Sequence, residues 1–154
     1  AYLYPAREAQ PVIELELDDR ISDIAADEVR MRQLLHNLIR NALEALDGQA
    51  SGCVTLSTDA IDSDSVELQV ADNGPGFDPE TVDNVFEPYV TTKAKGTGLG
   101  LSIVKKLVDE HGGTVVAENR AGGGAIVRVR MHRQNPSGIS GSDRQRNQQW
   151  RQHA

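Results

Sequence analysis

The chain has 154 residues, and an excess of 23 acidic over 16 basic residues gives it a formal net charge of −7. A nucleic-acid partner, which needs a broad basic face, is therefore not expected. The single cysteine, Cys53, cannot form an internal disulfide, and no apolar run approaches the ~20 residues of a membrane span. Without a signal peptide, we expect a cytoplasmic domain that makes no membrane contact itself, whether or not its parent protein is anchored in the inner membrane.

The start of the chain predicts a strand followed by a long helix. Residues 12–17, VIELEL, alternate apolar and acidic side chains, which is typical of a half-buried strand with Ile13, Leu15 and Leu17 on one side. Residues 27–46 carry apolar side chains at helical spacing and begin with acidic residues, which suit the positive end of a helix. The expected buried stripe is Met31, Leu35, Leu38, Ala42 and Ala45.

Two strands and a short helix are predicted next. Residues 53–60 and 65–72 alternate in polarity on either side of a polar turn, which is typical of a hairpin. Asp78 and Pro79 are suited to the cap and first position of a short helix that ends by Pro88. The hairpin residues expected inside are Cys53, Val54, Leu56, Val66, Leu68 and Val70.

The last third of the folded chain predicts a loosely held segment, a helix and a second hairpin. Residues 89–98 are polar and contain glycine, without apolar periodicity. Residues 99–110 have helical periodicity and end at two glycines. Residues 114–119 and 125–131 flank the turn RAGGG. The side chains expected to be buried on this helix are Leu101, Val104, Leu107 and Val108.

This order of elements predicts an α+β fold. Strands and helices follow as β-α-β-β-α-α-β-β, which favours a two-layer sandwich with helices on one face of a mixed, mostly antiparallel sheet. We place this domain at residues 12–133, after a linker remnant at 1–11. Residues 134–154 are rich in Gln, Asn, Ser, Gly and Arg and predict a disordered tail.

Two asparagines stand in the middle of the long helix. Asn37 and Asn41 are four residues apart and so share a face, which Glu44 extends. Asparagine is a mediocre helix former, so the pair needs a reason. One explanation is a solvated stripe, although such stripes usually carry Glu, Lys and Arg. The other is a pair of neutral oxygen ligands for Mg²⁺ and its phosphates.

The segment DNGPGF, residues 72–77, directly follows a strand. Asn-Gly alone signals only a turn, but Gly74 and Gly76 also permit the close approach of a ligand. If an adenine lies there, an ionised Asp72 accepts a hydrogen bond from its amino group and repels the carbonyl of guanine. Such a charged hydrogen bond contributes about 1.5–3 kcal/mol.

A third polar stretch, KGTGLGLSIVKK at residues 95–106, places glycines ahead of an amphipathic helix. It does not have the Walker A spacing G-x-x-x-x-G-K-[ST]. It also does not match the dinucleotide fingerprint, because Leu101 stands where the third glycine belongs. The glycines still let the backbone wrap phosphates at a helix N-terminus. Lys93 and Lys95 lie just before and offer positive charge, with the solubility of a loop as the alternative.

Together these segments resemble the catalytic ATP-binding domain of sensor histidine kinases, within the superfamily of gyrase, Hsp90, histidine kinase and MutL ATPases. NLIRNALEAL looks like that family's N box, DNGPGF like its first G box, FEPYVTTK like its F box, and GTGLGLSIVKKLVDEHGG like its second G box. The match covers roughly residues 12–131 of the chain. The sequence of the segment TTKAKGTGLGLSIVKK is especially similar to that of the nitrogen-regulation sensor kinases.

The resemblance implies a Bergerat-type ATP-binding sandwich with a lid over residues 78–98. By motif position, Asn41 would be the Mg²⁺ ligand and Asn37 would touch the phosphates, while Asp72 would read adenine. Glu44 departs from this pattern, because many of these kinases have a lysine or arginine there that can contact phosphate. The remaining ATP-site residues would be Gly74, Gly76, Phe77, Lys93, Gly96, Thr97, Gly98, Leu99, Gly100 and Leu101.

Asn37 also bears on the type of reaction. Hydrolytic members of the superfamily carry a glutamate there as general base, and an amide cannot take a proton at neutral pH. Phosphoryl transfer to an imidazole needs only positioning and charge neutralisation. The histidines of the chain, His36, His111, His132 and His153, do not match the family's acceptor pattern.

We therefore expect the catalytic module of a longer kinase. Its γ-phosphate would go to separate phosphoacceptor and dimerisation helices, and from them to a response regulator. The alternatives are an ATP-binding regulatory module that transfers nothing, and an ATPase or serine kinase of the same superfamily.

Overall fold

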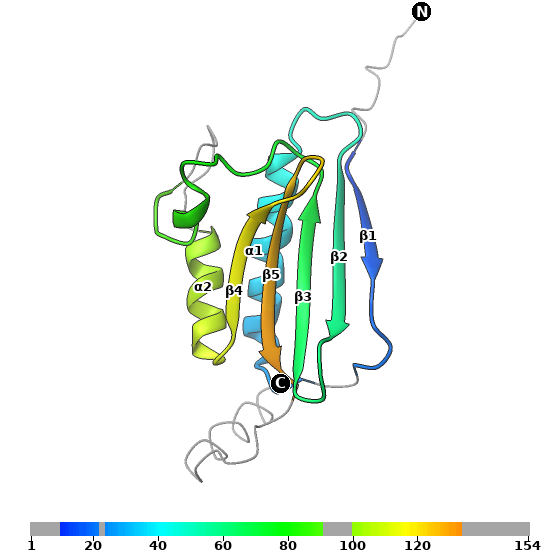
Figure 1. The fold of residues 1–154 in the computed structure, drawn as a ribbon, viewed down its shortest axis with the longest axis vertical. Helices are drawn as coiled ribbons and strands as arrows, with labels where there is room; N and C mark the ends of the chain where they lie inside the picture. The colour runs from blue at the N-terminus through cyan, green and yellow to red at the C-terminus, as the bar shows by residue number, and fades with distance from the viewer. Residues whose placement is uncertain (1–9, 22–23, 91–99, 134–154) are drawn as a thin grey trace, which may run out of the picture.

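The computed structural model describes residues 10–21, 24–90 and 100–133, which form two layers (Figure 1). A five-stranded sheet carries the helices on one face, so the predicted α+β sandwich is confirmed. The predicted tail at 134–154 and most of the predicted linker and loosely held segment lie outside the described residues. The elements are β1 (Val12–Glu16), α1 (Glu28–Ala45), β2 (Cys53–Ala60), β3 (Ser65–Asp72), η1 (Val82–Asn84), α2 (Gly100–Glu110), β4 (Thr114–Asn119) and β5 (Ala125–His132).

The sheet has the strand order β1-β2-β3-β5-β4. β1 runs parallel to β2, and the other neighbours are antiparallel. Both predicted hairpins form, and they join side by side because β3 pairs with β5, with Ala71 opposite Ile126. The end of β3 and the start of β5 therefore meet at one end of the sheet.

The core lies between the sheet and the helices. α2 buries the four side chains that its periodicity predicted. On α1 the buried side chains are Leu34, Leu38 and Ala42. The predicted stripe was therefore wrong at Met31, Leu35 and Ala45, which are only partly buried. Cys53 begins β2 as expected, but it is only half-buried.

The first strand corrects a prediction. β1 forms, but Ile13, Leu15 and Leu17 are 48%, 63% and 58% exposed, so the strand is not half-buried. The register places Ile13 beside Val54 and Leu15 beside Leu56, on the face that carries the helices. α1 packs over β2 and β3 and α2 over β4, so the helix layer ends before it reaches this edge.

The short helix predicted after residue 78 is also smaller than expected. Asp78 does begin a turn, since the N–H of Glu80 donates to its carboxylate and the N–H of Val82 to its carbonyl, both at 2.9 Å. Only the three-residue 3₁₀ helix η1 follows. The Asp and Asn side chains of this segment favour turns, and its β-branched side chains lose rotamer freedom in a helix.

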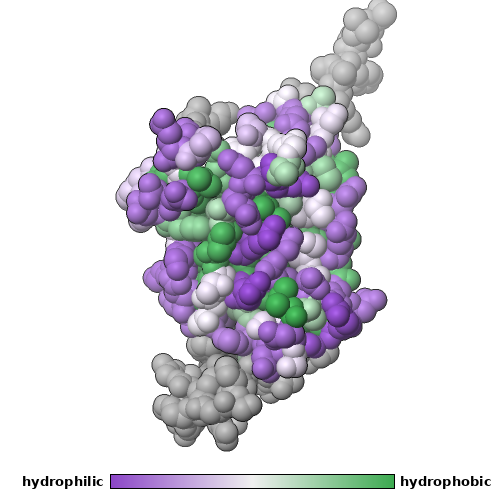
Figure 2. Space-filling model, in the orientation of Figure 1, coloured by the Kyte–Doolittle hydropathy of each residue, from purple (hydrophilic) through white to green (hydrophobic). Residues whose placement is uncertain are grey.

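The outer face of the sheet is polar. Figure 2 shows hydrophilic side chains across the strands, with apolar side chains among them. Arg128 pairs with Glu118 at 3.1 Å, and Arg130 pairs with Glu67 at 3.0 Å. Burial would raise the pKa of Glu67, but hydrogen bonds from Gln69 and Arg130 outweigh it and hold that pKa below its ordinary value. This face is therefore stabilised by its own charge pairs.

The ends of the two helices are tied together. The N–H of Asp27 donates to Nε2 of His111 at 3.3 Å, and Nδ1 of the same ring lies 2.7 Å from the carbonyl of Leu107. Because Nε2 accepts, the neutral ring carries its proton on Nδ1. Arg30 and Glu110 add an ion pair at 2.6 Å. The start of α1 is thus fixed to the end of α2 through the His111 ring.

We expect Asp27→Ala to lower the free energy of unfolding by about 0.5–2 kcal/mol, the usual cost of losing an N-cap. Its carboxylate accepts hydrogen bonds from the N–H groups of Val29 and Arg30 at 2.9 and 3.3 Å. Urea denaturation measures the change. Asp47→Ala, just past the other end of α1, is the control, and equal stability of the two variants would contradict the cap.

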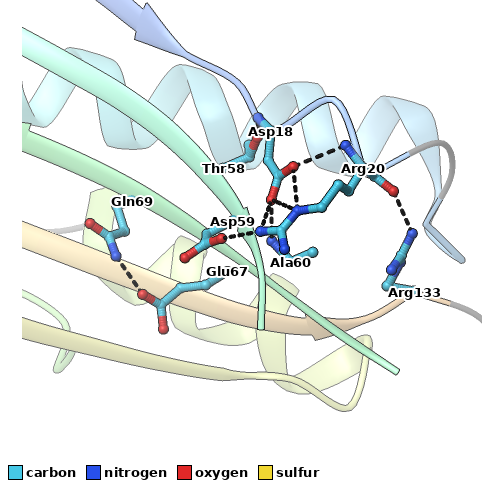
Figure 3. A network of polar contacts seen from close by, with 8 residues as sticks. All are labelled: Asp18, Arg20, Thr58, Asp59, Ala60, Glu67, Gln69 and Arg133. Carbon is cyan, nitrogen blue, oxygen red and sulfur yellow. Dashed lines mark hydrogen bonds and ion pairs between the residues drawn. The ribbon is translucent and has the colours of Figure 1, made fainter. Parts of the chain in front are cut away.

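A second polar cluster fixes the connection between β1 and α1 (Figure 3). Asp18 accepts hydrogen bonds at 2.9 Å from the N–H groups of Arg20 and Ala60, and pairs with the Arg20 guanidinium at 2.7 Å. Arg133 donates to the carbonyl of Arg20 at 2.7 Å. The Arg20 guanidinium, with these two N–H groups, holds the pKa of Asp18 well below its usual range.

Acid should therefore weaken the fold partly through Asp18. A folded-state pKa below the unfolded value of about 3.9 gives stability that is present above that value and lost as pH falls through the folded pKa. We expect Asp18→Asn to be less stable than the parent near neutral pH and to lose less stability on acidification. Urea denaturation near neutral pH and at about pH 3, below that unfolded value, measures this. Asp19→Asn is the charge-matched control, and an acid response as large in Asp18→Asn as in the parent would contradict the assignment.

Candidate functional site

A pocket opens at the end of the sheet where β3 ends and β5 begins. Its volume is about 70 Å³, below the roughly 300–1,000 Å³ of sites that enclose a whole small ligand. The pocket itself therefore cannot enclose a whole small ligand, and the rest of a larger ligand must lie outside it. The lining residues are Asn41, Ala45, Asp72, Gly76, Phe77, Asp78, Thr81, Val85, Val90, Leu101 and Ala125.

The structure brings together predicted site residues that are far apart in the chain. Asn41 comes from α1, Asp72 from the end of β3, Gly76 and Phe77 from the loop after it, and Leu101 from the first turn of α2. Lys93, Gly96, Thr97, Gly98 and Leu99 lie outside the described residues. The described lining comes from segments of all four sequence motifs and also from residues outside them, namely Asp78, Thr81, Val85 and Ala125.

Asp72 is the buried charge of the pocket. Its residue is 3% exposed, and burial of a carboxylate is costly unless hydrogen bonds satisfy it. The N–H of Gly74 donates to Oδ1 at 2.9 Å, which orients the side chain. Since Asp72 also lines the pocket, its carboxylate is held in a fixed orientation at the pocket wall.

The two loop glycines are required by close contacts. A Cβ on Gly74 would lie 2.9 Å from the carbonyl oxygen of Ala45, so this residue lets the loop approach the last turn of α1. Gly76 has φ 82, and its Cβ would lie 2.7 Å from Oδ1 of Asn119. Side chains at either position would push the loop away from the pocket.

The two helix asparagines have different surroundings. Asn41 lines the pocket, whereas Asn37, one turn earlier, lies beside the start of α2. Nδ2 of Asn37 donates to the carbonyl of Gln33 at 3.0 Å, and a Cβ on Gly100 would lie 3.8 Å from its Oδ1. Glu44 pairs with Arg40 at 3.1 Å. The asparagine stripe therefore runs from the pocket toward the N-terminal end of α2, while Glu44 points into an ion pair.

Several lining residues were not identified from the sequence as part of the site. Ala45, Asp78, Thr81, Val85, Val90 and Ala125 are small, apolar or turn-forming residues whose types carry no chemical signal. The turn between β4 and β5 was also missed, although it contacts the loop at residues 72–77. Its run of three glycines was the available signal, because a hairpin turn alone does not need three.

A comparison with known families decides what this arrangement belongs to. The model of the histidine kinase-, DNA gyrase B- and HSP90-like ATPases matches residues 26–135, which contain the asparagine stripe, the glycine loop and α2. The chain belongs to this ATPase family. ATP binding is the shared property of such ATPase domains, and the predicted resemblance is confirmed.

Curated relatives of this ATPase domain are sensor proteins. The sensor protein FixL of Bradyrhizobium diazoefficiens is 41% identical over 127 residues, which is 82% of this chain and 25% of FixL. A putative NtrY-like sensor histidine kinase of Rickettsia conorii is 41% identical over 109 residues, 71% of this chain and 18% of the relative. The chain spans a quarter or less of these two relatives, which are consistent with the predicted nitrogen-regulation type.

Solved structures similar to this ATPase domain are histidine kinases. The nucleotide-free catalytic domain of ThkA has a TM-score of 0.72 at 33% identity and covers 83% of this chain and 84% of its own. Full-length ShkA in complex with AMPPNP has a TM-score of 0.64 at 32% identity, covering 82% and 26%. ThkA in complex with the response regulator TrrA has a TM-score of 0.67 at 31% identity, covering 80% and 34%.

The helices of the described ranges were also compared with the requirements of a membrane span. In residues 10–21, 24–90 and 100–133, no helix has both the length and the apolar character for crossing a bilayer.

Proposed function

We propose that the domain binds Mg²⁺-ATP at this pocket and donates the γ-phosphate to a histidine on separate phosphoacceptor and dimerisation helices of a two-component sensor kinase. The observation that carries the proposal is the buried carboxylate of Asp72, which shares one pocket with the Asn41 amide. This pairing offers a reader for the base and a neutral oxygen ligand for the metal. The domain would work in the cytoplasm, where ATP is supplied.

Hydrogen bonding selects which base the site binds. An ionised Asp72 can only accept, so it favours the exocyclic amino group of adenine over the carbonyl of guanine. Val85, Leu101 and Ala125 give the pocket apolar walls that suit the faces of a flat ring. A pocket volume of about 70 Å³ leaves the ribose and phosphates outside the pocket.

The phosphate end lies toward the start of α2. The described residues contain no group of three or more His, Cys, Asp or Glu that could hold a metal ion, and Mg²⁺ is commonly held by few protein ligands together with phosphate oxygens and waters. The amide oxygen of Asn41 fits that donor set, and bound Mg²⁺ would supply charge neutralisation. The N-terminal end of α2, beside Asn37, favours the negative charge of phosphates.

Asn37 favours transfer of the γ-phosphate to an acceptor over its hydrolysis by water. Its side chain is an amide hydrogen-bonded to Gln33, and an amide cannot remove a proton from water at neutral pH. In the proposed reaction a neutral imidazole nitrogen of the acceptor forms the new bond to the γ-phosphorus. The bond from that phosphorus to the bridging oxygen breaks, and the electron pair leaves with ADP.

The partners of the whole protein follow from the same proposal. Because the chain spans only part of its relatives, the acceptor histidine belongs to a segment outside this domain. ThkA, whose structure is similar, was solved with the response regulator TrrA. We expect the phosphorylated helices of the parent protein likewise to pass the phosphate to a response regulator.

The test is a transfer reaction with labelled ATP and Mg²⁺. The domain is mixed with the separately expressed acceptor helices of its parent protein, and the label is followed on both proteins and in solution. Acid-labile, base-stable label on the helices is the expected result. ATP binding without transfer would indicate a regulatory module, while free phosphate or acid-stable label would indicate an ATPase or a serine kinase, and either result would contradict the proposal.

A further inference from the structure

The last residue of β4 and the first residue after it hold the loop of residues 72–77 at both ends. Nη1 of Arg120 donates to the backbone carbonyl of Asp72 at 3.0 Å. Oδ1 of Asn119 accepts from the N–H of Phe77 at 2.6 Å, and Nδ2 of Asn119 donates to the carbonyl of Phe77 at 3.0 Å. The loop that carries Asp72 is therefore bonded at its first and last residues to the neighbouring residues Arg120 and Asn119.

The turn is shaped for this contact. Gly124 has φ 102, and a Cβ there would lie 2.0 Å from the carbonyl oxygen of Asp72, so the two backbones touch without room for a side chain. The N–H of Arg120 donates to the carbonyl of Gly124 at 2.8 Å, and the N–H of Gly123 donates to the carbonyl of Arg120 at 3.2 Å. These bonds fix the position of the Arg120 backbone next to Asp72.

We propose that Asn119 and Arg120, here named the brace, position Asp72 and thereby set the selectivity of the site for the base of the nucleotide. The inference rests on the proposed function, because it takes ATP as the ligand. Neither residue lines the pocket, so both are positioning residues that act through Asp72 and Phe77. A binding group must be held within about 0.5 Å of its working geometry by such supporting contacts.

The brace should affect the binding of ATP more than that of GTP, which an effect on stability alone would not do. Asp72 is oriented on one side by the N–H of Gly74 and on the other through its own carbonyl by Arg120. Loss of the guanidinium frees the Asp72 backbone to shift, and its carboxylate then no longer meets the adenine amino group at hydrogen-bond length. A guanine base gains nothing from the original position, so its binding should be little affected.

The experiment compares ATP and GTP affinities by calorimetry, with Mg²⁺, for the full 154-residue chain and its variants. Arg120→Met removes the donor, and Asn119→Asp keeps the acceptor for Phe77 but replaces the donor with an oxygen. Arg128→Met is the matched control, because it removes an arginine on the same hairpin whose partner is Glu118. Arg120→Lys, which keeps a positive donor, should restore part of the wild-type behaviour.

We expect Arg120→Met to lower the affinity for ATP about tenfold, near the lower limit for a charge-assisted hydrogen bond. GTP affinity should stay within about twofold, so the ratio of the two affinities falls, whereas a purely structural role would weaken both nucleotides equally. Asn119→Asp should move the ratio in the same direction, and Arg128→Met should leave it unchanged.

An unchanged ratio in a folded Arg120→Met protein would overturn the inference. If that variant does not fold, the ratio of ATP to GTP affinity in Asn119→Asp decides in the same way. If neither variant folds, the brace serves stability, and the inference is also overturned. The two proposals fail separately. A wild-type chain that binds no ATP removes the proposed function and the inference with it, whereas wild-type selectivity retained in the variants removes only the inference.

Discussion

Asp72→Asn should weaken the binding of ATP by about 10- to 150-fold, the equivalent of the 1.5–3 kcal/mol of a charged hydrogen bond. An asparagine keeps an oxygen that can accept from the N–H of Gly74, which the native Oδ1 does at 2.9 Å, so the loop should hold its shape. Its amide nitrogen then replaces an acceptor with a donor. Calorimetric titrations with ATP and GTP measure the change.

The direction of the selectivity change is the sharper part of this prediction. A donor at Asp72 repels the amino group of adenine and matches the carbonyl of guanine, so the preference for ATP over GTP should shrink or reverse. Asp109→Asn, which removes the same charge from an exposed position on α2 beside Lys105, should leave both affinities unchanged. If Asp72→Asn still rejects GTP as strongly as the parent chain, another residue reads the base.

Asn41→Asp should weaken Mg²⁺-ATP binding by roughly tenfold or more, because it places a negative charge in the pocket, where the triphosphate is already negative. Two unit charges about 4 Å apart interact by about 4 kcal/mol at an effective dielectric constant near 20, and the metal offsets part of this. Binding in the absence of Mg²⁺ should fall further than binding in its presence. Calorimetry at several Mg²⁺ concentrations, with thermal unfolding to confirm the fold, measures both.

The control for this variant is on the same helix. Gln33→Glu makes the same amide-to-carboxylate change two turns before Asn41, at an exposed position outside the pocket lining. It should alter Mg²⁺-ATP affinity by less than about twofold, because an exposed charge is screened by salt. Equal effects of the two variants, or an unchanged affinity in Asn41→Asp, would remove Asn41 from the metal site.

The parts of the fold that the sequence predicted are those decided by neighbouring residues. The periodicity, the buried face and the end of α2 are all determined by residues within a few turns. At its end, Gly112 has φ 70, and the N–H of Gly113 donates to the carbonyl of Val108 at 3.0 Å. The Asp72 loop is similar, because the strand end, the glycines and the carboxylate are contiguous. Such local patterns specify a turn or a helix end without knowledge of the tertiary structure.

The errors came from properties that the spacing of apolar residues does not determine. Alternation identified the face of β1 that carries Ile13 and Leu15, but exposure of that face depends on how far the helix layer extends across the sheet. The helix after Asp78 had a correct start, yet residues such as Val82 and Asn84 limit it to one 3₁₀ turn. Neither outcome is encoded by the spacing of apolar residues.

The brace could not be predicted for a topological reason. β5 lies next to β3, with Val70 opposite Val127 and Ala71 opposite Ile126, although β3 and β5 are not consecutive strands. This pairing alone brings the turn before β5 to the end of β3, where Arg120 meets Asp72. A reader of the sequence sees only a glycine-rich hairpin turn, because its contact partner is 48 residues away.

The central claim, that Mg²⁺-ATP binds between α1, the loop after β3 and the start of α2, is tested most directly by nuclear magnetic resonance. Backbone amide signals of the isotope-labelled chain are followed during a titration with Mg²⁺-ATP. The account predicts that the signals of Asn41, Asp72, Gly76, Phe77 and Leu101 shift together and saturate, while those of β1 stay in place. Unchanged signals at these five residues at saturating nucleotide would contradict it.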